Sequence, residues 1–199
     1  GSNDLFVKIY EVLPTGGYNL SVDNTYDYIF AGWEEYIDDV AITRNCDRIA
    51  ISFKGHYFVV FGFDNETGEL VQHFDFAANT GDFFGPVSRV EFSPSGEYLF
   101  VMGENSIVSR FDLSSLDQST TEATQIDVPV GQSFISDLKL GPDDRIYLMG
   151  TSFNRIDAMS NTESPMNEIE IEASVYEGPV SGYFPNTSNI RCSLFPFFS

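Results

Sequence analysis

Three aspartates and one arginine stand directly before short apolar runs of the chain. Asp38 and Asp39 precede the first run, Arg89 the second and Asp137 the third. Ca²⁺ takes about 6–8 oxygen ligands, and carboxylates suit it. If the three runs converge, these aspartates could hold Ca²⁺ or hydrogen-bond a polyol. The alternative is a solvated rim around a water-filled channel.

Residues that carry catalysis are scarce. The two histidines, His56 and His73, are interpreted as ordinary surface or edge residues. No serine lies in a nucleophile elbow, and no glycine-rich loop has the lysine that a phosphate site needs. Two carboxylates about 5–10 Å apart could serve a glycosidase, but nothing selects such a pair from the 30 acidic residues. We therefore expect no catalytic residues and a protein that is not an enzyme.

Two segments place large aromatic rings beside glycine and proline, as exposed loops do. One contains Phe83 and Phe84, and the other contains Tyr183 and Phe184. Aromatic faces can stack on sugars or anchor a protein partner. These four residues are therefore the predicted ligand-binding residues. The alternative is that the rings fill gaps between sheets.

One sequence pattern occurs three times and would position these residues. It reads VAITRNCDRIAIS from Val40, VEFSPSGEYLFVM from Val90 and LKLGPDDRIYLMG from Leu138. Each copy is a short apolar strand, a tight polar turn and a second apolar strand. The starts lie 50 and 48 residues apart. A period of about 40–50 residues built only of strands is typical of a β-propeller, in which each repeat is one blade.

Each repeat continues with a third and a fourth strand. The third ends in an apolar residue followed by aspartate, at Asp64, Asp112 and Asp157. The predicted fourth strands are Leu70–Phe76, Thr124–Val128 and Ile169–Ala173. Runs with two apolar faces, such as Tyr57–Phe61, favour sheets that are covered on both sides. The predicted buried residues are Val40, Ile42, Ile49, Val90, Phe92, Leu99, Leu138, Leu140 and Ile146.

The prediction is an all-β propeller of four-stranded antiparallel blades, at about residues 36–76, 87–128 and 134–174. A β-sandwich with coincidental spacing is the alternative fold. Residues 1–2 resemble a cloning remnant, and residues 3–199 are expected to form a single domain. A fourth, composite blade would combine residues 3–33 with 180–199, pairing Leu5–Val12 with Ile190–Leu194. The alternative is that the chain is the C-terminal part of a larger propeller.

Composition and charge exclude several classes of partner. The net charge is −20, from 30 acidic and 10 basic residues, so the basic surface that nucleic acids or anionic membranes require is missing. No apolar run approaches the roughly 20 residues that span a bilayer. The two cysteines, Cys46 and Cys192, are expected to be unpaired thiols, with a disulfide as the alternative.

Three stretches carry a family resemblance: FDNETGEL from Phe63, VEFSPSGEYLFV from Val90 and LKLGPDDRIYLMG from Leu138. They resemble secreted β-propeller proteins of Bacteroidota, which have WD40- or YVTN-like repeats. The tail Arg191–Phe197 is similar to the last strand of that family, with an extra phenylalanine before the proline. The resemblance implies secretion or surface attachment, often through a C-terminal sorting module, and no assigned catalytic residues.

Taken together, the residues favour a non-enzymatic, secreted or cell-surface propeller that binds a protein or a glycan. The alternatives are a lactonase or glycosidase that uses channel carboxylates, and a purely structural module of a larger surface protein. We expect no cofactor other than calcium at the aspartates, no nucleic acid and no membrane insertion.

Overall fold

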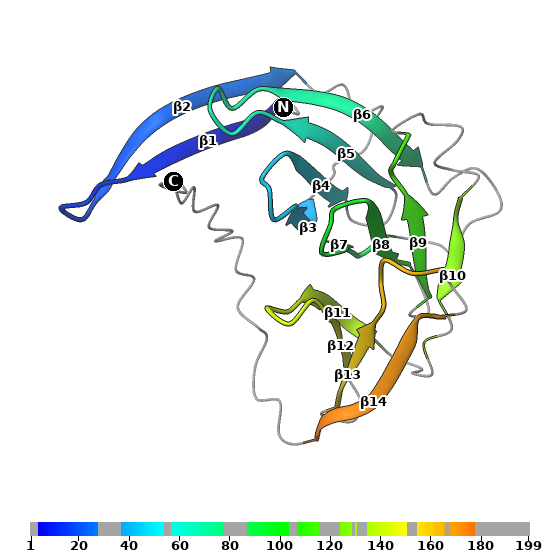
Figure 1. The fold of residues 1–199 in the computed structure, drawn as a ribbon. Coiled ribbons are helices and arrows are strands. Elements are labelled where there is room, and N and C mark those ends of the chain that lie inside the picture. Colours follow the sequence, from blue (N-terminus) through cyan, green and yellow to red (C-terminus); the bar gives the residue numbers. More distant parts are fainter. Residues whose placement is uncertain are drawn as a thin grey trace.

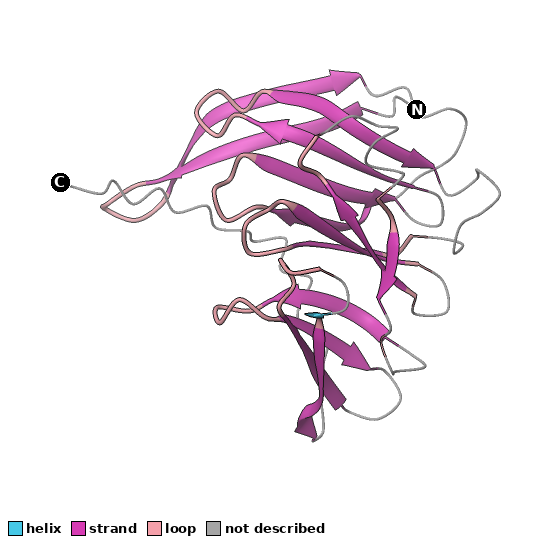
Figure 2. Ribbon diagram, turned by 45° about the vertical axis from the view of Figure 1, so that its right-hand side comes forward, coloured by secondary structure: helices cyan, strands magenta, loops and turns pink. Residues whose placement is uncertain are grey.

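The structure of the chain is a computed structural model. It describes residues 4–27, 37–53, 57–77, 87–103, 107–115, 124–128, 130, 135–150, 155–165 and 168–177. These residues form three four-stranded antiparallel sheets and one two-stranded hairpin. The sheets fan out with their first strands, β3, β7 and β11, toward a common centre and their last strands toward the periphery (Figures 1 and 2). We call each four-stranded sheet a blade. The predicted four-stranded blades are confirmed.

Each blade is a simple meander in which every strand pairs with its neighbour in sequence. The first blade contains β3 to β6, with bounds Ile37–Ile42, Arg48–Phe53, Tyr57–Phe63 and Leu70–Ala77. The second contains β7 to β10, with bounds Arg89–Phe92, Tyr98–Met102, Val108–Asp112 and Ile126–Val128. The third contains β11 to β14, with bounds Ile135–Leu140, Ile146–Gly150, Arg155–Ser160 and Glu170–Glu177.

The turn between the first two strands of each blade has the same backbone shape. Its fourth residue adopts a positive φ, of 55° at Cys46, 79° at Gly96 and 65° at Asp144. The N–H groups of Cys46 and Gly96 each donate to the carbonyl three residues earlier, on Thr43 and Ser93, at 2.9 Å. Because glycine adopts positive φ without steric cost, the second blade has the least strained of the three turns.

Two apolar clusters join the blades. The cluster between the first and second blades consists of Ala41, Ala50, Phe58, Val60, Val87, Val90, Phe92, Leu99, Val101, Phe111 and Leu113. Within it, the rings of Phe58 and Phe111 pack edge to face with centroids 5.2 Å apart. The cluster between the second and third blades contains Phe100, Met102, Val108, Val128, Ile135, Leu138, Ile146, Leu148 and Met159. Each buried phenylalanine or leucine contributes about 1.5–3 kcal/mol, so these clusters dominate the stability of the blade interfaces.

Polar contacts that involve the turns of neighbouring blades add to the apolar clusters. Arg48 Nη1 donates to the carbonyl of Gly96 at 3.0 Å, from the first blade to the second. The backbone N–H of Ser95 donates to Glu163 Oε1 at 2.7 Å, from the second blade to the third. The blades therefore follow one another in space in the order in which they occur in the sequence.

The third repeat differs from the prediction at its third strand. Asp64 directly follows β5, and Asp112 is the last residue of β9. Each accepts a hydrogen bond from the backbone N–H two residues later, at 2.8 Å. Asp157 instead lies buried in the middle of β13, and the turn follows at Asn161, whose φ is 57°. The prediction that Asp157 ends the third strand is wrong, because an apolar residue followed by aspartate also occurs inside this strand.

Five of the nine residues predicted to be buried are buried, namely Val90, Phe92, Leu99, Leu138 and Ile146. The prediction is wrong for Val40, Ile42, Ile49 and Leu140, which are half-buried. Three of these, Val40, Ile42 and Leu140, line a cavity near the centre of the fan. Ile49 packs at the edge of a third apolar cluster within the first blade.

The N-terminal region forms a hairpin. Strand β1 (Asp4–Val12) pairs with β2 (Tyr18–Asp27), and the hairpin lies beside the first blade in both views (Figures 1 and 2). The predicted strand Leu5–Val12 is confirmed. Its predicted pairing with Ile190–Leu194 lies outside the described residues, so closure of the ring stays a prediction.

Cys46 is disulfide-bonded, so the expectation of an unpaired thiol is wrong for this residue. Cys192 lies outside the described residues. Among the residues that the structure describes, no helix is long and apolar enough to cross a membrane.

Candidate axial site

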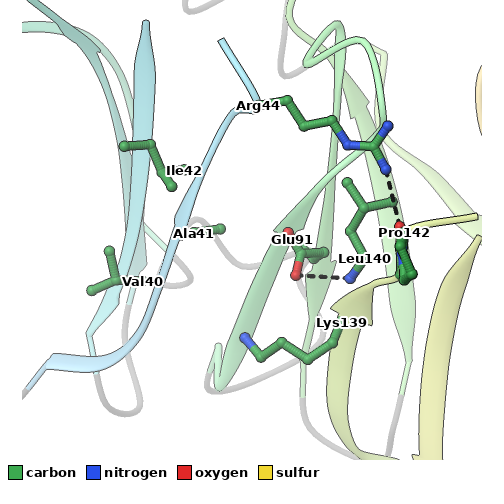
Figure 3. Close-up of a pocket in the computed structure, with 9 residues that line it drawn as sticks. Val40, Ala41, Ile42, Arg44, Glu91, Lys139, Leu140 and Pro142 are labelled. Carbon is green, nitrogen blue, oxygen red and sulfur yellow. Dashed lines mark hydrogen bonds between the residues drawn. The ribbon is translucent and has the colours of Figure 1, made fainter. Parts of the chain in front are cut away.

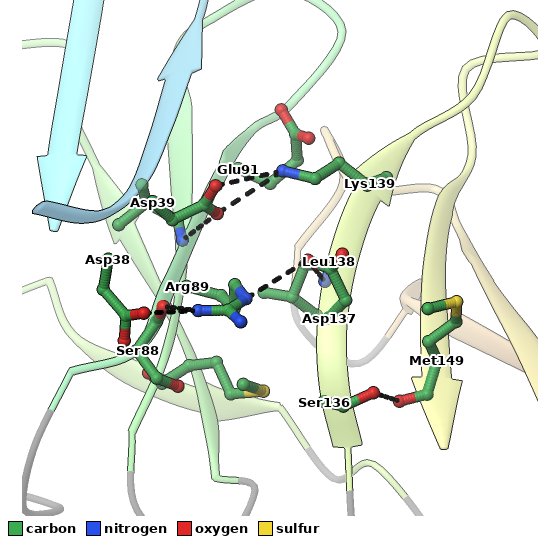
Figure 4. Close-up of polar contacts among 12 residues, drawn as sticks. Asp38, Asp39, Ser88, Arg89, Glu91, Ser136, Asp137, Leu138, Lys139 and Met149 are labelled. Atoms are coloured by element: carbon green, nitrogen blue, oxygen red, sulfur yellow. Dashed lines mark hydrogen bonds and ion pairs between the residues drawn. The ribbon is translucent and has the colours of Figure 1, made fainter. Parts of the chain in front are cut away.

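The predicted rim residues meet at the centre of the fan. Arg89 on β7 lies between aspartates of the two flanking blades (Figure 4). Its Nη1 is 3.1 Å from Asp38 Oδ1 on β3, and its Nε is 3.5 Å from Asp137 Oδ1 on β11. The three innermost strands thus bring together residues that are up to 99 positions apart in the sequence.

Asp39 is also at this centre, but it pairs with a residue that sequence reasoning missed. Lys139 Nζ on β11 lies 3.3 Å from Asp39 Oδ1 and 3.4 Å from Oδ2. The backbone N–H of Val90 donates to Asp39 Oδ2 at 3.3 Å. Asp39 is buried whereas Lys139 is 43% exposed. The lysine therefore neutralises a buried carboxylate while keeping part of its own side chain accessible.

Glu91 on β7 is the second residue that sequence reasoning missed. Its side chain is buried. Its Oε1 accepts from the N–H of Phe92, and its Oε2 from the N–H of Leu140, both at 3.1 Å. Burial raises the pKa of Glu91 to about 7, against the opposing effect of Lys139. Burial also raises the pKa of Asp137. We call Asp38, Asp39, Arg89, Glu91, Asp137 and Lys139 the axial cluster.

A cavity of about 310 Å³ opens beside the axial cluster. Figure 3 shows β3 on one side and Glu91 and Lys139 on the other. The lining residues are Val40, Ala41, Ile42, Arg44, Glu91, Lys139, Leu140, Gly141 and Pro142. Arg44, in the turn after β3, crosses to the third blade, where its Nη2 donates to the Gly141 carbonyl at 3.0 Å and its Nη1 pairs with Asp144. The first and third blades therefore contact each other on both sides of the cavity.

Calcium at Asp38, Asp39 and Asp137 stays a prediction. The described residues contain no group of three or more His, Cys, Asp or Glu side chains placed to hold a metal ion. The guanidinium of Arg89 lies between Asp38 and Asp137, and Lys139 pairs with Asp39. Ca²⁺ would fit here only if both cationic side chains moved aside, because it needs several oxygen ligands at once.

The predicted aromatic ligand-binding residues, Phe83, Phe84, Tyr183 and Phe184, lie outside the described residues. His56 also lies outside them. His73 is on β6, the outermost strand of the first blade. The histidine therefore lies on the strand farthest in the sheet order from the axial cluster.

A second hollow of about 360 Å³ adjoins the axial cavity on the third blade. It shares Lys139, Leu140, Gly141 and Pro142 with the axial cavity. Its other walls are Asp137, Tyr147, Met149 and Ile156, which are mainly apolar and half-buried. The axial cavity thus continues onto a mostly apolar surface.

Solved structures identify the architecture. A protein from Lactobacillus plantarum superposes with a TM-score of 0.55 at 16% identity, covering 89% of this chain and 51% of that one. A Bacteroides uniformis protein, provisionally named 6-phosphogluconolactonase, superposes with a TM-score of 0.57 at 14% identity, covering 85% and 47%. The chain has a β-propeller fold. At this level of identity, the two likenesses establish only the fold. The chain spans about half the length of each of these proteins. No protein-family model and no curated protein sequence matches it.

Proposed function

We propose that this chain is a non-enzymatic propeller module that binds a glycan in its axial cavity. The observation that carries the proposal is a cavity whose polar lining retains unused hydrogen-bonding capacity. Lys139 and Arg44 are 43% and 42% exposed while each already holds an ion pair. A lysine has three N–H donors and an arginine five, so both can still bond a sugar hydroxyl.

The apolar part of the lining suits the other face of a sugar. Val40, Ile42 and Pro142 contribute apolar surface beside these cations. Sugars present C–H groups on one side and hydroxyls on the other, so a mixed lining can contact both. Pockets for small ligands measure about 300–1,000 Å³, and the cavity of about 310 Å³ falls at the lower end. This size favours a sugar unit over a protein partner, which needs about 800 Å² of surface on each side.

The non-enzymatic part of the proposal is supported by the pairing within the axial cluster. Arg89 contacts Asp38 and Asp137, and Lys139 contacts Asp39. Glu91 accepts two backbone hydrogen bonds. A catalytic acid or nucleophile must instead be oriented toward the reacting atoms of a substrate. The cluster fixes the inner strands and shapes the cavity beside them.

We propose a secreted or cell-surface location for the same module. Cys46 is disulfide-bonded, and disulfides form and persist mainly in oxidising compartments. The net charge of −20 keeps such a protein soluble. The resemblance of its repeats to secreted Bacteroidota propellers is a third support.

A second candidate is a hydrolase of lactones or glycosides, which one observation favours. Burial raises the pKa of Glu91 to about 7, and a general acid works best with a pKa near the working pH. A screen of lactone and glycoside substrates distinguishes the candidates. Turnover that disappears in Glu91→Gln would establish the hydrolase and refute the non-enzymatic proposal.

A glycan array tests the binding proposal directly. We expect the wild-type chain to bind a subset of glycans, and Lys139→Met to lose that binding. Lys8→Met is the matched control, because Lys8 also holds a half-exposed ion pair, with Asp23 at 3.1 Å, on the N-terminal hairpin. Absence of binding across the array, or equal loss in both variants, would contradict the proposal.

A further inference from the structure

The charged residues that line the axial cavity differ from the rest of the protein. The chain carries a net charge of −20, yet two of the three ionisable residues lining the cavity are cations, Arg44 and Lys139. The third is the buried Glu91. Lys139 pairs with Asp39 and Arg44 with Asp144, but neither aspartate lines the cavity. A ligand in the cavity therefore meets the two cationic side chains rather than their partners, which favours a ligand with a negative charge.

We infer that the axial cavity selects an acidic sugar, whose carboxylate pairs with Lys139 and whose hydroxyls bond Glu91 and Arg44. The inference rests on the proposed glycan binding and specifies the chemical class of the glycan. The sugar would lie between the first and third blades, because Arg44 comes from the turn after β3 and Lys139 from β11 (Figure 3).

The existing ion pairs leave room for this carboxylate. The two contacts from Lys139 Nζ to Asp39, at 3.3 and 3.4 Å, are long for charged hydrogen bonds, which are usually about 2.7–2.9 Å. Arg44 uses Nη1 for Asp144 and Nη2 for Gly141, so its Nε–H makes neither contact. An incoming carboxylate could therefore pair with Lys139, and a sugar hydroxyl with Arg44, without breaking the contacts that join the blades.

The ionisation of Glu91 provides the second part of the argument. The charged groups that face it are Lys139 from β11 and Asp39 from β3, and Arg44 shares the cavity. When Glu91 is protonated, the cavity is one charge unit more positive and the Glu91 O–H can donate a hydrogen bond to a sugar hydroxyl. When Glu91 is ionised, its charge repels the sugar carboxylate. Affinity for an acidic sugar should therefore fall as pH rises through the pKa of Glu91, about 7.

Calorimetry with two matched sugars tests the inference. Glucuronate and glucose differ mainly in the carboxylate, so we expect glucuronate to bind at least about tenfold more tightly at about pH 6, since a charged hydrogen bond is worth a factor of this size. We expect this preference to shrink severalfold at about pH 8. In Glu91→Gln, the affinity for glucuronate should not change over this pH range.

Two variants, each with a matched control, test whether the cavity residues are responsible for the preference for glucuronate. Arg44→Gln should weaken the binding of both sugars, and Lys139→Met should reduce the glucuronate preference at least about tenfold. The matched controls Lys8→Met and Arg145→Gln should keep it, because Lys8 pairs with Asp23 on the hairpin and Arg145 with Glu172 on β14.

Three outcomes separate this inference from the proposed function. Equal binding of glucose and glucuronate would overturn the inference and leave glycan binding intact. A glucuronate affinity that does not vary with pH in the wild type would overturn the role given to Glu91. Binding of neither sugar, together with a negative glycan array, would overturn both the inference and the proposed function.

Discussion

Lys139 Nζ, on the innermost strand of the third blade, lies 3.3 Å from Asp39 Oδ1 on the innermost strand of the first. The two residues are 100 positions apart in the sequence. Arg89, on the strand between them, contacts Asp38 and Asp137 from the same two blades. Two cations thus pair with three aspartates across the axis, and this pairing positions the cavity beside them.

A double-mutant cycle on Asp39 and Lys139 tests this pairing. Lys139→Met leaves a buried carboxylate without its cation, so we expect a loss of about 1–3 kcal/mol in the free energy of unfolding. Lys139 is 43% exposed, so solvent screening limits the coupling to about 1 kcal/mol. Asp39→Asn keeps a side-chain oxygen for the N–H of Val90 and should cost less. Strict additivity in urea denaturation would show that the pair contributes nothing.

Stability should decrease as pH rises from about 5 to 8, because of Glu91. Its pKa is raised from 4.5 to about 7 by burial, so the folded state binds more protons than the unfolded state in this window. The contribution of Glu91 to the free energy of unfolding is complete below its pKa in the unfolded state. It is lost as pH rises through the pKa of Glu91 in the folded state. One pKa unit corresponds to about 1.4 kcal/mol, which makes the loss a few kcal/mol at most.

Urea denaturation at several pH values measures this slope, and Glu91→Gln should flatten it. The raised pKa of Asp137 acts in the same direction. The lowered pKa values of Asp64 and Asp143 act in the opposite direction, but only below about pH 4, where these aspartates titrate. A wild-type stability that is level or rises between about pH 5 and 8 would show that Glu91 is ionised normally.

Gly96→Ala should destabilise the contact between the first two blades. A Cβ at Gly96 would lie 2.7 Å from Thr43 Cγ2, and the φ of Gly96 is 79°. Gly16→Ala is the matched control, since its φ is 83° but a Cβ there would meet nothing within 4 Å. We expect about 1 kcal/mol for the φ strain in both variants and about 1–2 kcal/mol more at Gly96. Adding Thr43→Ser removes the methyl group and should recover the excess; equal losses at both glycines would contradict this account.

Two buried threonines should respond in opposite directions to the same substitution. Thr43 Oγ1 donates to Asp47 Oδ1 and accepts from the N–H groups of Asp47 and Arg48 at 3.2 and 3.1 Å. Within the described part of the chain, Thr162 Oγ1 is buried without a hydrogen-bond partner. Thr43→Val should cost about 1–3 kcal/mol, and Thr162→Val should raise stability by up to about 1 kcal/mol. Thermal denaturation of both variants checks the signs, and a loss at Thr162 would reveal a partner for its hydroxyl.

The blades were predictable from the sequence because their pattern is local. A strand, a tight turn and a second strand recur at nearly equal spacing, and both faces of a blade strand can be apolar. What the repeat does not encode is which side of each inner strand lines the cavity. Val40, Ile42 and Leu140 look like core residues but line the cavity and are half-buried. The prediction that Asp157 ends its strand was wrong for a related reason, because a local motif carries no information about strand length.

The site was only partly predictable. Asp38, Asp39, Arg89 and Asp137 were expected at the rim because they directly precede apolar runs, and the structure brings them together. Glu91 and Lys139 lie inside those runs, where a charged residue is easily taken for one that points to solvent. Their signal was a charge at the second position of the repeated pattern, between two apolar residues. Its meaning depends on contacts across about 50 residues or more, such as Leu140 N–H to Glu91, which spacing alone does not reveal.

Hydrogen–deuterium exchange with a glycan selected from the array tests the central claim most directly, because it separates the axial cavity from the aromatic segments. If the cavity is the binding site, the glycan should slow exchange in β3 and β11, including the amide of Leu140, which donates to Glu91. Protection confined to the segments around Phe83–Phe84 and Tyr183–Phe184, with β3 and β11 unchanged, would contradict an axial site.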